Sequence, residues 1–260
     1  MIYLYLFGTC FHFIYVFMII GKYKKMKKKI SAIIPVKANS SRLPGKNILP
    51  FGKSNLLLHK IEQLKQVEDL YEIIVSSDSD TMLEIAEKAG VKAIKRPEQY
   101  ANESVPFGCF LDYVCDICSG DHIMWACATS PLVEPSLYRK AIKTYFEKLE
   151  EGYDSLITCL PYQHFLMDEN GPINFEIGLK HTNSEKLPII YHFTNGVNLA
   201  PKEKVREWHY NWGPKAFKLL VNKREAADID DIYDLAQAKA MLDLSTLENE
   251  LEGWRNEHLK

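Results

Sequence analysis

The chain has 260 residues, of which 47% are hydrophobic and 25% are charged, and its formal net charge is −2. A chain of this length can bury a stable core without disulfides or structural metals, in one or two domains. The small net charge argues against nucleic acid as the main partner, because proteins that bind a phosphate backbone carry clustered excess lysine and arginine.

The cysteines are few for a chain of this length, six in all, which is typical of a reduced, intracellular protein. Cys115 and Cys118 form a CxxC pair with His122 nearby. A structural zinc site needs four ligands, and no second pair follows at a suitable spacing. The favoured interpretation is therefore two small apolar residues on a helix face.

Residues 1–20 are uncharged and mostly apolar, and a lysine-rich stretch follows at 21–29. A helix of twenty residues is about 30 Å long, roughly one hydrocarbon core, so it would serve as a membrane anchor. The lysines would then keep the rest of the chain in the cytoplasm. In the alternative, residues 1–25 are an over-extended start, and Met26 begins an ordinary soluble enzyme. Both interpretations place the catalytic part in the cytoplasm, and membrane contact is expected only under the first.

Short apolar runs alternate along the chain with segments of helical periodicity. The runs are continuous, as in strands buried on both faces, and cover residues 30–36, 72–77, 122–127 and 154–160. The predicted helices, with apolar residues three and four apart, cover residues 55–68, 79–90 and 134–152. This alternation predicts an α/β fold, with a mainly parallel twisted sheet and helices on both faces.

Residues 161–214 interrupt the alternation with prolines, glycines, aromatic residues and histidines. We interpret this segment as a smaller β-rich insertion that carries substrate or subunit contacts. A late strand at 215–221 and a helix at 231–242 complete the main domain, which runs over residues 26–242. Residues 243–260 form a predicted C-terminal helix, whose apolar stripe either packs on the parent domain or is exchanged across a dimer.

The loop after the first predicted strand carries three cations, Lys37, Arg42 and Lys46, with Ser40 and Gly45 among them. In an open α/β sheet, ligands bind just beyond the carboxyl ends of the strands. Neither a GxGxxG pattern nor a Walker pattern is present. Cations mixed with small hydrogen-bond donors suit a polyanion such as a triphosphate.

A cluster of acids lies far downstream, where a strand-like run leads into the helix at 231–242. Asp231 and Asp234 fit the first turn of that helix, where carboxylates favour the macrodipole. Asp228 and Asp230 instead alternate across Ile229, so they point to the same side of an extended segment and need a countercharge. A hard divalent cation that also contacts phosphate oxygens would supply it. The cation loop and the acid pair together predict a site for a nucleoside triphosphate with magnesium.

The segment AIIPVKANSSRLPGKN at 32–47 resembles the N-terminal signature of the acylneuraminate cytidylyltransferase family, IIPARxxSxRLPGKN. Further matches to the family follow in order up to about residue 242, among them IIVSSDSDTMLEIAEKAG at 73–90, RPEQYAN at 96–102, ATSPLVEPSLYRKAI at 128–142, NGVNLA at 195–200 and DIDDIYDLAQA at 228–238. Each match is weak alone, but the ordered series covers most of the chain.

The resemblance implies a nucleotide-diphospho-sugar transferase fold and a homodimer. It also implies a Mg²⁺-dependent transfer of CMP from CTP to an acidic sugar of the nonulosonic-acid or Kdo type, with release of pyrophosphate, for capsule or lipopolysaccharide synthesis. The implied nucleotide site is Lys37, Ser40, Arg42, Lys46, Asn47, Ser77, Asp78 and Arg96. Asp228 and Asp230 would hold the metal. Lys37, Arg42, Lys46 and Asp228 are the expected catalytic residues, with either Asp228 or a metal-bound hydroxide as the base.

The acceptor side departs from the family pattern. Cys127 stands where the sialic acid enzymes have a glutamine that contacts the sugar, and Lys37 replaces an arginine, so charge remains but the planar fork is lost. The expected acceptor-binding residues are Cys127, Thr129, Ser130, His164, Asn195 and Gly196. For several of these a structural role is the alternative: Ser130 as a helix cap, Asn195 and Gly196 as a turn, and His164 as a hydrogen-bonded core or surface residue.

These departures predict an altered acceptor. Two alternatives stay open. One is a cytidylyltransferase that acts on a phosphorylated acceptor and gives a CDP product. The other is a nucleotide-binding protein whose catalysis has degraded.

Overall fold

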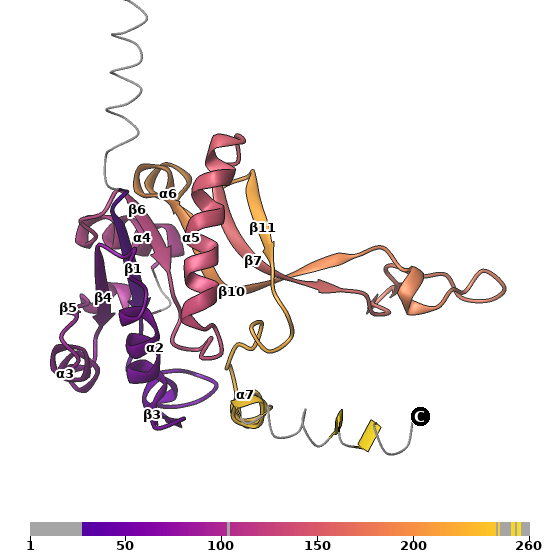
Figure 1. The fold of residues 1–260 in the computed structure, drawn as a ribbon, viewed down its shortest axis with the longest axis horizontal. Helices are drawn as coiled ribbons and strands as arrows, with labels where there is room; N and C mark the ends of the chain where they lie inside the picture. The colour runs from indigo at the N-terminus through magenta and orange to yellow at the C-terminus, as the bar shows by residue number, and fades with distance from the viewer. Residues whose placement is uncertain (1–27, 103–104, 243, 245–250, 253, 256–260) are drawn as a thin grey trace, which may run out of the picture.

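The computed structural model describes residues 28–102, 105–242, 244, 251, 252, 254 and 255 (Figure 1). Its centre is a seven-stranded sheet in the order β11-β7-β10-β6-β1-β4-β5. The strands are β1 (Ile30–Pro35), β4 (Glu72–Ser77), β5 (Lys92–Lys95), β6 (His122–Trp125), β7 (Ser155–Tyr162), β10 (Ile190–Pro201) and β11 (Ala216–Leu220). Only β10 runs antiparallel to its neighbours in this sheet. The mainly parallel sheet is therefore confirmed.

Helices cover both faces of the sheet. They are α2 (Leu56–Lys65), α3 (Asp80–Lys88), α4 (Phe107–Ile117), α5 (Pro135–Glu150), α6 (Lys202–Trp208) and α7 (Ile232–Leu242). Within β1, Ile34 belongs to the core cluster shared with α2, α3 and α5, whereas Ile33 belongs to the one shared with α4 and α6. Successive residues of a strand face opposite sides. This is why the run at 30–36 is apolar without a break.

Two elements were not among those predicted from the sequence. Helix α4 begins after Pro106, and its buried residues Phe110, Leu111, Val114 and Cys115 recur three and four apart, so the sequence did hold a helical signal there. Cys115 lies on α4 and Cys118 at its C-terminal cap, and both are buried free thiols. Their expected role as small apolar residues on a helix face agrees with this placement. Strand β5 is only four residues long at the sheet edge, and lysines occupy both of its ends.

The segment at 161–214 divides into two parts. The outer halves of β7 and β10 leave the sheet as a long twisted ribbon, whose end holds β8 (Met167–Asp168), β9 (Gly171–Pro172) and a short 3₁₀ turn at Ser184–Lys186 (Figure 1). We call residues 163–189 the arm. The inner half of β10, in contrast, pairs with β6 inside the main sheet. The insertion is therefore shorter than 161–214, because its second part completes the central sheet.

The two ends of the chain lie largely outside the described residues. This applies to the predicted anchor or extended start at 1–25 and to most of the tail at 243–260. The tail residues that are described are helical, and the side chains of Leu251 and Trp254 are 46% and 52% exposed. In the part of the chain that the structure describes, no helix is both long and apolar enough to cross a membrane.

Candidate active site

A pocket of about 860 Å³ opens at the carboxyl edge of the sheet, where residues that follow β1, β5 and β6 meet. One side is cationic and polar, and its lining comprises Lys37, Ser40, Ser41, Arg42, Lys46, Asn47 and Arg96. The other side is aromatic with a few amide and hydroxyl groups, and its lining includes Phe107, Phe110, Trp125, Cys127, Thr129, Phe193, Asn195, Tyr210 and Asn211. The pocket therefore combines a surface for an anion with one for a largely uncharged group.

The cation loop is held in shape by contacts between its two ends and the sheet. The backbone N–H of Ala38 donates to Asp78 Oδ1 at 2.8 Å, which fixes the start of the loop. Asn47 Nδ2 donates to the Lys37 carbonyl at 3.2 Å and so ties the end of the loop to its start. Gly45 takes a left-handed backbone (φ 65°) just before the 3₁₀ turn Lys46–Ile48. Glycine adopts this conformation without the usual Cβ penalty.

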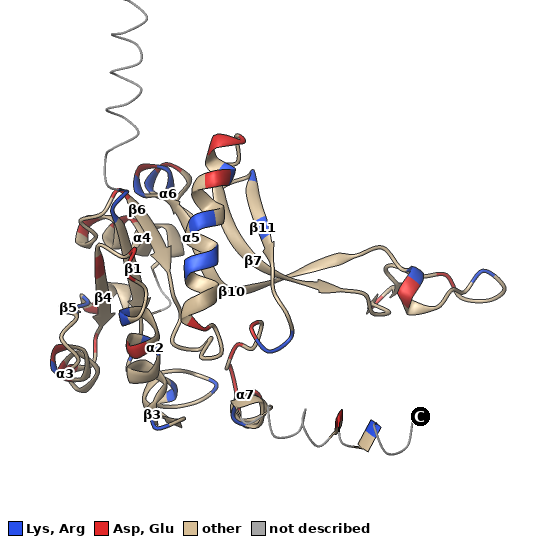
Figure 2. Ribbon diagram, in the orientation of Figure 1, with Lys and Arg blue, Asp and Glu red and all other residues tan. Residues whose placement is uncertain are grey.

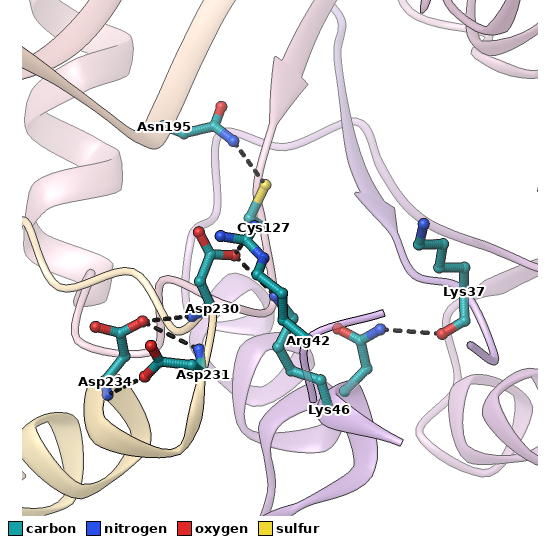
Figure 3. Close-up of polar contacts among 9 residues, drawn as sticks. Lys37, Arg42, Lys46, Cys127, Asn195, Asp230, Asp231 and Asp234 are labelled. Carbon is teal, nitrogen blue, oxygen red and sulfur yellow. Dashed lines mark hydrogen bonds and ion pairs between the residues drawn. The ribbon is translucent and has the colours of Figure 1, made fainter. Parts of the chain in front are cut away.

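The acid segment meets this loop. Asp230 Oδ1 lies 2.8 Å from Arg42 Nη2 and 3.1 Å from Lys46 Nζ (Figure 3). Asp234 Oδ2 accepts the backbone N–H groups of Asp230 and Asp231, and Asp231 Oδ1 accepts that of Asp234. Asp231 and Asp234 thus cap the start of α7, as expected from their place in the sequence. The carboxylate of Asp230 is left to face the cations.

Asp228 is more enclosed than Asp230. Its Oδ1 atom is buried and has no hydrogen-bond partner. Burial raises the pKa of Asp228, a hydrogen bond with the Thr129 side chain lowers it, and the nearby Asp230 charge raises it again. A buried carboxylate oxygen without a partner, beside a second carboxylate, fits the ligand preference of a hard divalent cation. Within the described residues, no group of three or more His, Cys, Asp or Glu side chains is arranged to hold a metal, so phosphate oxygens or water would complete the shell.

Most of the predicted nucleotide residues lie in or beside the pocket. Lys37, Ser40, Arg42, Lys46, Asn47 and Arg96 line it. Arg96 is buried, donates through Nη2 to the Ser76 carbonyl at 2.6 Å and stacks over the Phe110 ring. Burial lowers its pKa. Arg96 therefore supports the wall of the pocket, and its contact with a nucleotide stays a prediction.

Two predicted nucleotide residues do not line the pocket. Ser77 is fully buried, and its Oγ accepts the backbone N–H of Ser79 at 3.0 Å. Asp78 is engaged with the backbone of Ala38. In the structure both side chains bond to backbone groups and so support this region, and their contact with a nucleotide stays a prediction.

Of the six predicted acceptor residues, three line the pocket and three do not. Cys127, Thr129 and Asn195 line the pocket. Gly196 lies behind it, where a Cβ atom would come within 3.1 Å of Val133 Cγ2 and 3.2 Å of Thr158 Oγ1, so its role is close packing. Ser130 is buried below the pocket floor. His164 begins the arm and packs against Tyr162, outside the pocket of its own chain. These three residues thus lie outside the pocket lining of their own chain, and their contact with an acceptor stays a prediction.

A bulge in β10 shapes the acceptor side. The pairing of β10 with β7 shifts between Phe193 and Asn198, and Asn195 there has a left-handed backbone (φ 54°). Its Nδ2 donates to Cys127 Sγ at 3.5 Å (Figure 3). Its Oδ1 accepts from Asn198 Nδ2 at 3.0 Å. Burial raises the pKa of Cys127 to about 12, so the thiol stays protonated and acts as a small neutral group.

The sequence did not single out the aromatic wall. Phe107 packs edge-on against Trp125 and Tyr210, with ring centroids 5.9 Å and 5.8 Å apart. These rings come from α4, β6 and the segment after α6, three regions that only the tertiary fold brings together. The available signal was the aromatic content of residues 107–113, which is equally typical of a buried helix.

A mainly parallel sheet with a cation loop and an acid pair at its carboxyl edge is the architecture of nucleotidyltransferases that act on nucleoside triphosphates. Solved structures with this fold include a CMP-2-keto-3-deoxy-manno-octonic acid synthetase complexed with CTP, which is 16% identical with a TM-score of 0.61 and aligns over 84% of this chain and 99% of its own. A 4-diphosphocytidyl-2C-methyl-D-erythritol synthase from Anaerococcus prevotii matches with the same identity and TM-score, over 84% of this chain and all of its own. At this identity the likeness shows the fold alone.

The family follows from the sequence comparison. A family model described as cytidylyltransferase matches residues 31–173, more than half of the chain, and the chain belongs to this family. The resemblance to the acylneuraminate cytidylyltransferases is thereby confirmed.

Curated relatives agree with this family. The chain is 27% identical to the N-acylneuraminate cytidylyltransferase of Escherichia coli O18:K1:H7, over 82% of this chain and 52% of the relative. It is 23% identical to the pseudaminic acid cytidylyltransferase of Campylobacter jejuni, over 80% and 94%. It is 25% identical to the CMP-N,N'-diacetyllegionaminic acid synthase of Legionella pneumophila, over 84% and 97%. The chain thus spans about half the length of the first relative and nearly all of the other two.

Proposed function

We propose that this protein transfers CMP from CTP to an acidic sugar of the nonulosonic-acid or Kdo type and releases pyrophosphate. The observation that carries the proposal is the contact of Asp230 with Arg42 and Lys46 at the rim of the pocket. In this contact the cation loop and the acid segment, which are far apart in the sequence, meet beside a pocket whose lining includes Arg42 and Lys46. The names of the curated relatives support the acceptor class.

In this proposal the cation loop binds the triphosphate. Lys37, Arg42 and Lys46 neutralise the phosphates, and Arg42 exchanges its contact with Asp230 for a phosphate oxygen when CTP enters. The exchange costs little, because the Arg42 side chain is 65% exposed and exposed ion pairs contribute at most about 1 kcal/mol. Lys46, only 12% exposed, remains in place as the inner charge. Charges fixed in advance stabilise the negative charge that develops on the transferring phosphoryl group.

Asp228 and Asp230 would hold Mg²⁺ between the carboxylates and the phosphates. A bound Mg²⁺ supplies positive charge to the phosphate oxygens during the displacement. The chain's own part is to orient the two carboxylates, through Asp234 for the backbone of Asp230 and through Thr129 for the side chain of Asp228. Asp228 is also our proposed proton acceptor for the attacking hydroxyl, because its raised pKa brings it closer to the working pH.

The acceptor side favours a sugar acid over a phosphate ester. The lining residues from β6, β10 and the segments that follow β6 and α6 are Trp125, Cys127, Thr129, Phe193, Asn195, Tyr210 and Asn211, and none of them is a lysine or arginine. Amide groups suit hydroxyl and carboxylate oxygens, whereas a phosphate ester would require further cations. The loop cations are already assigned to the triphosphate.

The test is pyrophosphate release from CTP and Mg²⁺ with a panel of acceptors, with the product mass determined. The panel contains N-acetylneuraminic, pseudaminic and legionaminic acids, Kdo, and 2C-methyl-D-erythritol 4-phosphate. We expect a CMP-linked product with at least one acidic sugar. Turnover of the phosphorylated acceptor alone would reject the acceptor class. CTP binding without turnover of any acceptor would indicate a nucleotide-binding protein instead.

We further propose that the protein works as a homodimer in the cytoplasm, where CTP is available. The support for the dimer is the arm, which exposes a group of large apolar side chains: Phe165, Met167, Ile173, Ile177, Leu179 and Ile189. Exposed apolar patches of this kind mark interaction surfaces.

A further inference from the structure

Lys60 is a charged residue inside the hydrophobic core. It lies on α2 between Leu57, Ile61 and Leu64, on the stripe that faces the sheet, and its exposed fraction is 0%. Lysine is rarely fully buried, because transferring an ammonium group out of water is costly unless it is hydrogen-bonded. The surroundings of Lys60 must therefore compensate for this cost. A lysine on the apolar face of a predicted helix was the available sequence signal.

The ammonium group of Lys60 holds the loop that follows β6. Lys60 Nζ donates to the Ser130 carbonyl and to the Tyr138 hydroxyl, both at 2.8 Å. One turn further along α2, Gln63 Nε2 donates to the Pro131 carbonyl at 2.7 Å. Residues 126–131, which we call the β6 loop, are thus fixed from below by side chains of one helix.

The upper side of the β6 loop forms part of the active site. Cys127 and Thr129 line the pocket on its acceptor side. The Thr129 carbonyl accepts the backbone N–H of Ile229 at 2.8 Å, which ties the loop to the residue next to Asp228. The loop therefore connects Lys60 on one side with the acid segment on the other.

Burial also affects the charge of this side chain. It lowers the pKa of Lys60 to about 7, and the Asp228 carboxylate raises it by a smaller amount. The place of Lys60 is fixed by its two hydrogen bonds, to the Ser130 carbonyl and the Tyr138 hydroxyl.

We propose that Lys60 is a positioning residue of the active site: from within the core its ammonium group fixes the β6 loop, and through that loop it sets the places of Cys127, Thr129 and Asp228. Lys60 touches neither nucleotide nor acceptor. The catalytic part of this inference rests on the proposed function. The mechanical part, which concerns the order of the loop, does not.

The test compares Lys60→Met with Lys65→Met in the full-length chain. Methionine keeps the length of the side chain and removes the charge and the donors. Lys65 lies on the same helix but is exposed, and its contacts are the Ala89 carbonyl and a surface ion pair with Glu62, so its variant is the matched control. Three quantities are measured: amide hydrogen exchange by mass spectrometry, CTP affinity by calorimetry, and kcat and KM for the acidic sugar that wild-type protein turns over.

In Lys60→Met, we expect faster exchange in peptides that cover residues 126–131 and 228–230. We expect kcat/KM for the acceptor to fall by about 10- to 100-fold, the range found when groups that orient an active-site ligand are removed. CTP affinity should stay within about twofold, since the loop cations are held by Asp78 and Asn47 and not by Lys60. Lys65→Met should match the wild type in all three measurements.

Tyr138→Phe provides a second variant in case Lys60→Met fails to fold. It removes one acceptor of the ammonium group and leaves the β6 loop itself unchanged, so we expect the same peptides to exchange faster. Unchanged exchange of residues 126–131 in the folded variants would overturn the positioning role. Loss of CTP affinity together with acceptor turnover would also overturn it, because that result indicates a general loss of structure.

The two proposals fail in different ways. If wild-type protein turns over no acidic sugar while Lys60→Met loosens the β6 loop, the proposed acceptor is wrong and the positioning role of Lys60 stands. If wild-type protein is active and Lys60→Met leaves loop exchange and kcat/KM unchanged, the function stands and the role of Lys60 is overturned.

Discussion

At the scale of single residues, replacing Asp230 should change stability little and activity strongly. Its contacts with Arg42 and Lys46 are partly exposed, so Asp230→Asn should change the free energy of unfolding by less than about 1 kcal/mol. Turnover should fall by about 100-fold or more, because a proposed metal ligand at the phosphates is lost. Chemical unfolding and steady-state kinetics across a Mg²⁺ titration measure the two effects. Glu134→Gln, which removes the ion pair with Arg224 elsewhere on the surface, is the control. Near-normal turnover at low Mg²⁺ would contradict the metal assignment.

Lys46 should act on the nucleotide and not on the acceptor. Lys46→Ala removes a loop cation whose side chain is only 12% exposed. We expect CTP to bind about tenfold or more weakly while the acceptor KM changes little, because a hydrogen bond to a charged group contributes about 1.5–3 kcal/mol. Calorimetry with CTP alone measures this. Lys53→Ala, on the exposed turn between β2 (Pro50–Phe51) and β3 (Ser54–Asn55), is the matched control. An unchanged CTP affinity would reject the triphosphate role of Lys46.

Lys60 predicts a specific dependence of stability on pH. Its pKa is about 7 in the folded protein, against an ordinary value of 10.5. Between these two values the unfolded chain binds a proton that the folded protein does not, so this residue makes the free energy of unfolding rise with pH. Below about pH 7 both states are protonated and the contribution is constant. Urea unfolding from pH 6 to 9.5 should therefore show wild type gaining stability relative to Lys60→Met as the pH rises. Parallel curves for the two proteins would show that Lys60 has an ordinary pKa.

The sequence was sufficient to predict the residues whose position follows from the topology. Lys37, Lys46, Asp228 and Asp230 come after strand-like runs, and the carboxyl ends of parallel strands share one edge of a sheet. The roles of Ser77 and Lys60 could not be predicted in this way. They depend on which backbone groups a side chain meets in the folded core, and a linear pattern holds no information on that.

At the scale of elements, the bulge of β10 decides how the acceptor side is built. Asn195 holds a left-handed backbone there and bonds to Cys127 and Asn198. Glycine accepts such a backbone freely, whereas alanine pays about 1–2 kcal/mol. Asn195→Gly should therefore unfold at a higher temperature than Asn195→Ala, while both variants lose the amide contacts and raise the acceptor KM to a similar degree. Thermal unfolding and acceptor kinetics measure the two effects. Equal stability of the two variants would show that the backbone relaxes at this position.

The same strand shows why one boundary was misplaced. Residues 187–201 include an Asn-Gly dipeptide, which usually indicates a turn. In the structure this dipeptide forms the bulge, and the strand continues through Pro201 into the middle of the sheet. Helix α4 was missed for a different reason, because its periodic signal was present: Phe110, Leu111, Val114 and Cys115 recur at the spacing of a helix and form its buried face.

At the scale of the whole molecule, the sheet order brings the two ends of the domain together. Lys46 and Asp230 are 184 residues apart in the sequence and in contact in the structure. Positive and negative side chains are interspersed over the main domain (Figure 2). This distribution agrees with the small net charge. No broad basic surface is therefore expected to bind the nucleotide, and the cations that we assign to CTP are those of the pocket. The ribbon that leads from the sheet into the arm is an exception. It carries no Lys, Arg, Asp or Glu at residues 155–167 and 187–201 (Figure 2).

An uncharged ribbon that ends in exposed apolar side chains is a poor surface for a monomer in water. Ile177 and Leu179 near the tip of the arm are 77% and 108% exposed, so replacing them hardly alters packing within one chain. If a second copy covers the arm, the double variant Ile177→Asp and Leu179→Asp should convert a dimer into a monomer of 30.0 kDa, because two buried charges would face apolar partners. Light scattering coupled to size-exclusion chromatography measures the mass.

Tyr71→Asp, at an exposed aromatic residue outside the arm, should leave the dimer intact. The double variant should still bind CTP with wild-type affinity, since none of the cations in the pocket belongs to the arm. A wild-type mass of one chain would show that the arm has a different partner.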